Sequence, residues 1–87
     1  MLKNIENVLT TFKNVHKNRT GKPAKGRLQV IWEENVEDIK HYSVWSLGPH
    51  YPFVRGQQAG DAFLDISKNE ITIKLEGSEA SYTVSLN

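Results

Sequence analysis

The sequence of 87 residues contains no cysteine. This absence excludes a disulfide framework, a thiolate zinc site and a cysteine nucleophile. No apolar run comes near the roughly 20 residues that span a bilayer. The first residues mix charged and amide side chains with apolar ones, so the continuous apolar segment of a signal peptide is also missing. We therefore expect a cytoplasmic protein that does not insert into a membrane.

A chain of this length accommodates one domain with one small core, and we predict a single domain over residues 1–87. With neither a disulfide nor a visible metal staple to support that core, the margin of stability is expected to be on the order of a few kcal/mol.

Charge is sorted along the chain. Residues 1–27 hold seven lysines and arginines against one acid, Glu6, which gives a net charge of +6. Residues 28–87 hold four cations against nine acids, which gives a net charge of −5. A basic segment can face a polyanion while the whole protein stays near neutral. The sorting therefore points to a kind of partner and to no particular reaction.

Apolar residues near the start follow a helical period and fall in one arc: Leu2, Ile5, Val8, Leu9, Phe12 and Val15. This pattern predicts an amphipathic helix over about residues 2–17, which Gly21 and Pro23 end. Residues 18–27 form a polar, basic connection whose glycines and proline do not continue the helix.

From residue 28 onward the apolar period changes to two, which is typical of β-strands and predicts a sheet over residues 28–87. The alternation places Trp32 on the same face as Leu28 and Val30. Residues 33–38 are interpreted as an acidic turn and residues 48–60 as a long loop. Three further strands after the loop form a meander.

One helix followed by about five strands predicts an α+β fold, in which the helix covers the apolar face of an antiparallel sheet. The helix should pack there through Leu2, Ile5, Leu9 and Phe12.

The first candidate site is the basic stretch at the helix end and in the connection. Its members are Lys13, Lys17, Arg19, Lys22, Lys25 and Arg27. Such a stretch can neutralise phosphates of a DNA or RNA backbone with little sequence specificity. The leading hypothesis is therefore a small, non-enzymatic, nucleic-acid-associated protein. The simpler interpretation is a solvated surface that balances the acidic sheet.

The second candidate site is the segment of residues 41–55, which holds four of the eight aromatic residues. Its candidate contact residues are Trp45, His50, Tyr51, Phe53 and Arg55. Aromatic residues beside an arginine are typical anchors of protein interfaces. The competing hypothesis is thus a protein-binding module, such as an inhibitor or accessory subunit, with the basic stretch providing electrostatic steering. In the simpler interpretation, Trp45 and Phe53 fold back as a second small core.

Catalytic chemistry has little support in the sequence. His16, His41 and His50 allow a minor alternative, a histidine-dependent nuclease, if two of them converge. Their spacing does not match a preformed metal site, and neither a phosphate-binding glycine loop nor a serine nucleophile elbow is present. We therefore expect no catalytic residue, no metal and no cofactor.

Exposure of the aromatic segment separates the two main hypotheses. An exposed segment favours a protein partner, whereas a buried segment beside an exposed basic stretch favours nucleic acid.

Overall fold

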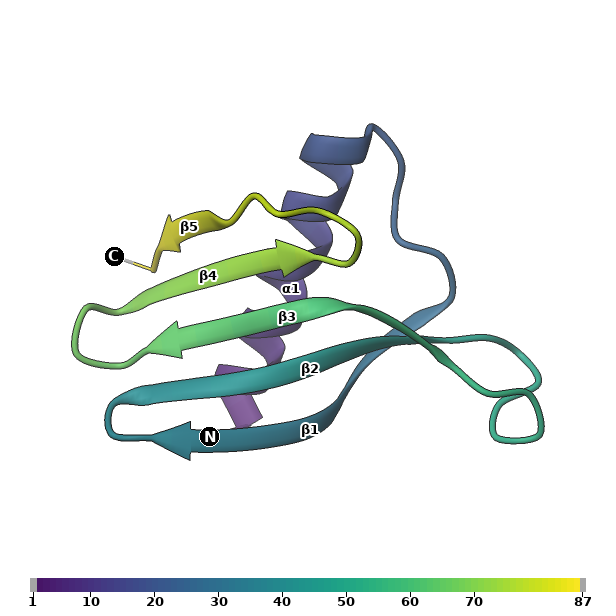
Figure 1. Cartoon of the computed structure of the whole chain (residues 1–87), viewed down its shortest axis with the longest axis horizontal. Helices are drawn as coiled ribbons and strands as arrows, with labels where there is room; N and C mark the ends of the chain where they lie inside the picture. The colour runs from purple at the N-terminus through teal and green to yellow at the C-terminus, as the bar shows by residue number, and fades with distance from the viewer. Residues whose placement is uncertain (1, 87) are drawn as a thin grey trace.

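The computed structural model describes the backbone of residues 2–86 and the side chains of residues 5–86. One helix, α1 (Leu2–Thr20), precedes five strands. The strands are β1 (Arg27–Val36), β2 (Ile39–Leu47), β3 (Gln57–Asp65), β4 (Glu70–Leu75) and β5 (Tyr82–Ser85). They pair antiparallel in chain order within one sheet, and α1 crosses one face of it (Figure 1). The predicted α+β fold is confirmed.

The apolar arc of α1 packs on the sheet as predicted. Val8 and Phe12 are fully buried, and Ile5 and Leu9 pack partly buried against the same core. The predicted contact of Leu2 lies outside the described side chains. The helix continues three residues beyond the predicted end at residue 17, up to Thr20.

The helix ends at Gly21, one of the two residues expected to end it. Gly21 has a φ of 76°, a left-handed conformation that glycine adopts without the steric cost of a Cβ atom. Its amide donates a hydrogen bond of 2.9 Å to the carbonyl of Lys17. The connection is therefore shorter than predicted and spans residues 21–26, because residues 18–20 are helical and Arg27 already belongs to β1.

The core lies between α1 and the inner face of the sheet, which is the face that α1 covers. Strand residues that are buried in the core include Tyr42, Val44, Ala62, Leu64, Ile71 and Ile73. At Gly60, an added Cβ atom would lie 2.2 Å from the carbonyl oxygen of Lys74 and 2.9 Å from Cε2 of Phe12. Only glycine leaves room there for the ring of Phe12 and the neighbouring backbone. Burial raises the pKa of the Tyr42 hydroxyl, and the carboxylate of Glu33 raises it further.

The predicted position of Trp32 on the core face is wrong. The register between β1 and β2 shifts between Val30 and Trp32, which is a β-bulge at Ile31. One extra residue reverses the alternation of side chains beyond it. Trp32 therefore pairs with Ser43 on the outer face, the face opposite α1, and it is 46% exposed.

Two loop boundaries also differ from the predictions. The acidic turn predicted over residues 33–38 is mostly strand, because β1 runs to Val36 and the turn itself contains only residues 37–38. The loop predicted to end at residue 60 ends at Gly56, where β3 follows.

The turn between β3 and β4 is held by the side chain of Asp65. Its carboxylate accepts hydrogen bonds from the hydroxyl of Ser67 at 2.7 Å and the amide of Lys68 at 3.1 Å. The bond from Ser67, followed by the bond from Lys68, lowers the pKa of the Asp65 carboxyl. Across residues 2–86, no helix has the apolar length that crossing a bilayer requires.

We predict that Phe12→Ala lowers the free energy of unfolding by about 3 kcal/mol or more, because it empties a fully buried site between α1 and Gly60. The measurement is denaturant unfolding followed by tryptophan fluorescence. Phe53→Ala is the matched control, since Phe53 is 96% exposed and its loss should leave stability unchanged. Equal stability of the two variants would contradict the assignment of Phe12 to the core.

Candidate binding site

A loop of residues 48–56 projects beyond the sheet between β2 and β3 (Figure 1). Two backbone hydrogen bonds shape it. The amide of Tyr51 donates to the carbonyl of Gly48 at 3.2 Å, and the amide of Val54 donates to the carbonyl of His50 at 2.9 Å. The peptide bond between Tyr51 and Pro52 is cis. Prolines fix their own φ angle and restrict the residue before them. The loop therefore has a defined turn structure.

The tip of this loop is apolar and open to solvent. Phe53 is 96% exposed, Val54 is 58% exposed and Tyr51 is 41% exposed. Phe53 therefore does not fold back into a second core, and that interpretation is wrong for Phe53.

Trp45 lies apart from the loop, in β2, where it is half-buried. Its Nε1 donates a hydrogen bond of 2.8 Å to the hydroxyl of Ser43. The base of the loop is fixed instead by buried Leu47, since an added Cβ atom on Gly56 would lie 2.6 Å from Cδ2 of Leu47. The other four predicted contact residues are exposed on the loop: His50, Tyr51, Phe53 and Arg55.

The six predicted phosphate-contacting residues follow α1, the connection and the start of β1. All six are exposed: Lys13, Lys17, Arg19, Lys22, Lys25 and Arg27. Within residues 5–86, none of these side chains forms an ion pair with an acid. The guanidinium of Arg19 lies 4.2 Å from the ring centroid of Tyr82, a cation–π contact that joins the end of α1 to β5.

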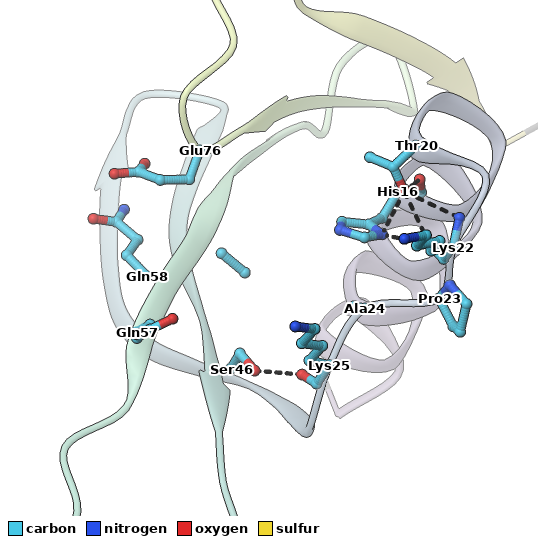
Figure 2. A pocket seen from close by; sticks show the side chains of 11 residues that line it. His16, Thr20, Lys22, Pro23, Ala24, Lys25, Ser46, Gln57, Gln58 and Glu76 are labelled. Atoms are coloured by element: carbon cyan, nitrogen blue, oxygen red, sulfur yellow. Dashed lines mark hydrogen bonds between the residues drawn. The ribbon is translucent and has the colours of Figure 1, made fainter.

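A hollow of about 360 Å³ lies between the end of α1, the connection and the adjoining parts of β2 and β3. Figure 2 shows the ring of His16 turned into it, while the side chains of Gln58 and Glu76 point away. Lys25 reaches the hollow from the connection, and its carbonyl accepts a hydrogen bond from the hydroxyl of Ser46. The charge turned toward the hollow is therefore positive.

The orientation of His16 is fixed by the end of the helix. Its Nδ1 lies 2.9 Å from the carbonyl oxygen of Lys22, and the hydroxyl of Thr20 lies 2.8 Å from the carbonyl oxygen of His16 itself. A carbonyl oxygen only accepts hydrogen bonds, so the contact with Lys22 is a hydrogen bond when Nδ1 carries the proton. The hydroxyl oxygen of Thr20, 3.3 Å from Nδ1, can accept from the same N–H. The neutral ring then keeps its free lone pair on Nε2.

The two predicted sites lie next to each other. Arg27 pairs with Leu47 at the end of β2, where the loop begins. A second hollow of about 340 Å³ has both Arg27 and Tyr51 in its lining. The basic stretch thus reaches the base of the aromatic loop, which the sequence alone did not indicate.

The outer face of the sheet carries a cluster that the sequence pattern did not predict. The Nε2 of His41 lies 2.9 Å from Oδ1 of Asp61, and both side chains are less than one third exposed. The imidazole stacks on Phe63 with ring centroids 4.3 Å apart, and it meets Trp32 edge-on at 5.2 Å. The alternation of Asp61 and Phe63 with buried residues indicates that both side chains lie on the outer face. The bulge at Ile31, which brings Trp32 to the same face, has no signal in the sequence.

The three histidines of the nuclease hypothesis are not brought together. His41 lies about 20 Å from the end of β2 at Leu47, at 3.3 Å per residue, and His50 lies in the loop beyond that end. His16 lies on α1, on the opposite face of the sheet from His41. Among the described residues, no three His, Asp or Glu side chains are grouped so that they could hold a metal ion.

A scan against protein-family models and searches of curated proteins and of solved structures found no match.

We predict that His16 is the Nδ1–H tautomer when it is neutral, because Nδ1 donates to the carbonyl of Lys22. A long-range ¹H–¹⁵N correlation spectrum measures this directly. His50 is the control, since it is exposed and should show the ordinary mixture of tautomers. A neutral His16 with its proton on Nε2 would contradict the hydrogen bond from Nδ1 to Lys22.

Proposed function

We propose that this protein is a protein-binding module that inserts the loop of residues 48–56 into an apolar pocket of a partner. The observation that carries the proposal is the 96% exposure of Phe53 at the tip of a hydrogen-bonded loop. Adjacent exposed apolar side chains are unusual on a monomeric protein and often mark an interaction site.

The loop also has the features of a preorganised anchor. Its two backbone hydrogen bonds and two prolines reduce the ordering that a partner would have to impose. Less ordering on binding leaves more of the interaction energy as affinity. Aromatic and arginine side chains dominate binding energies in protein interfaces, and Tyr51, Phe53 and Arg55 supply both kinds here.

The charge around the loop favours an acidic partner. Arg55 lies in the loop, Arg27 lies beside its base, and Lys25 precedes Arg27 in the connection. Positive charges around an apolar anchor accelerate encounter with a negatively charged surface and contribute less to the final affinity. In this proposal the basic stretch attracts the partner and the loop binds it, so the two need not contact the same part of the partner.

We predict that Phe53→Ala weakens the complex by 2 kcal/mol or more, which is about thirtyfold in Kd, because an anchor loses its buried area. The partner is captured from nuclease-treated cell extract, and titration calorimetry measures the affinity. Thermal melting of the free variant should be unchanged, since Phe53 is exposed.

Ile66→Ala is the matched control, because Ile66 is 51% exposed and directly follows the end of β3 that lies away from the loop. It should bind like the unmodified protein. Equal affinity of the Phe53 variant, or equal losses in both variants, would remove the loop as the binding site.

We also infer a second candidate function, binding of a nucleic-acid backbone by the basic stretch. It is supported by the six exposed cations, which form no ion pair among the described residues. Cations that have no acidic partner can each replace a counterion on a phosphate.

For this second candidate, around five phosphate contacts predict a log–log slope of affinity against salt of about −4 to −5 on duplex DNA. Joint replacement of Lys22, Lys25 and Arg27 by alanine should make the slope shallower by about 2.7, the share of three contacts. Fluorescence anisotropy with labelled DNA and RNA at several salt concentrations measures it. An absence of binding at low salt would exclude the candidate.

A further inference from the structure

We propose that two copies of this chain pair through β1, edge to edge and antiparallel, so that their sheets join into one. The strand spans Arg27–Val36 and forms one edge of the sheet (Figure 1). An edge strand presents a row of backbone donors and acceptors that a second strand can pair with.

Exposed apolar side chains accompany this open edge. Ile31 is 47% exposed, Trp32 is 46% exposed and Val36 is 60% exposed. The opposite edge is a poorer template, because β5 has four residues against the ten of β1. Pairing of β1 with itself is therefore the longest self-contact that the sheet edges allow.

The charges along β1 favour a second copy of β1 in the antiparallel direction. The strand begins with a cation, Arg27, and carries two acids, Glu33 and Glu34, in its second half. Parallel pairing of two copies would set like charges side by side, which destabilises a sheet. Antiparallel pairing sets the basic start of each copy beside the acidic end of the other.

The register can be stated from the side-chain directions. Arg27 precedes buried Leu28 and therefore points to the outer face, whereas Glu34 reaches the same face after the bulge, opposite His41. A two-fold axis perpendicular to the sheet keeps the outer faces of both copies on one side. Arg27 of one copy can then lie directly opposite Glu34 of the other, twice in each pair.

The bulge and the glutamates would ordinarily protect an edge strand from association. Here the two glutamates repel an acidic or parallel strand but attract the basic start of a second β1. The two-fold arrangement uses the same edge on both copies, so it closes at two and does not extend into a fibre.

Reciprocal charge reversal tests the proposal, with mass measured by light scattering and sedimentation at low salt. The unmodified protein should be a dimer that dissociates as salt is raised. Arg27→Glu and Glu34→Arg should each weaken self-association by about tenfold or more, because each places like charges at both contacts. An equimolar mixture of the two variants should restore the dimer, since every contact then joins opposite charges.

Two controls keep the result decisive. Lys74→Glu changes an exposed charge on β4, away from the edge, and should leave the dimer unchanged. Phe53→Ala should also leave it unchanged, which separates this contact from the loop. A monomeric unmodified protein, variants that stay dimeric, a mixture that stays monomeric, or loss of the dimer in Phe53→Ala would each overturn the proposal.

Discussion

The contact of Phe12 with Gly60 is the constraint on which the rest of the structure depends. A single helix covers the whole apolar face of the sheet in the described residues, so its position must be fixed by few contacts. The missing side chain of Gly60 lets the Phe12 ring approach the backbone of β3 more closely than any other residue would allow. That approach fixes the distance of α1 from the sheet. Gly21 then ends the helix beside the sheet, where the connection and the His16 hollow follow.

Because α1 covers only the inner face, the side chains of the outer face contact one another. There His41 pairs with Asp61 and contacts Trp32 and Phe63. The imidazole of His41 and the carboxylate of Asp61 are thus engaged with each other. The features on which the proposals rest lie at the margins of the sheet: the loop of residues 48–56, the basic stretch and the edge of β1. All three proposals therefore concern margins of the sheet.

The sequence predicts the elements well because hydrophobic period is a local property. The apolar arc of α1 and the alternation in β3 and β4 required no knowledge of the partner strands. The bulge at Ile31 could not be predicted, since it exists only relative to β2, and it moved Trp32 to the opposite face. The exposure of Phe53 depends likewise on tertiary structure, because an aromatic residue in a loop is compatible with either a core or an anchor.

The loop and the edge of β1 are linked by the topology. Arg27 begins β1 beside Leu47, where the loop leaves β2, so the loop lies at the basic end of the edge strand. Antiparallel pairing of two edges would place the two loops at opposite ends of the joined sheet. A partner with two equivalent pockets at matching separation would then bind both loops, and the second binding event would occur at a high effective concentration. In such a complex a loop of modest individual affinity would suffice, because the proposed self-association through the edge of β1 would supply the second anchor.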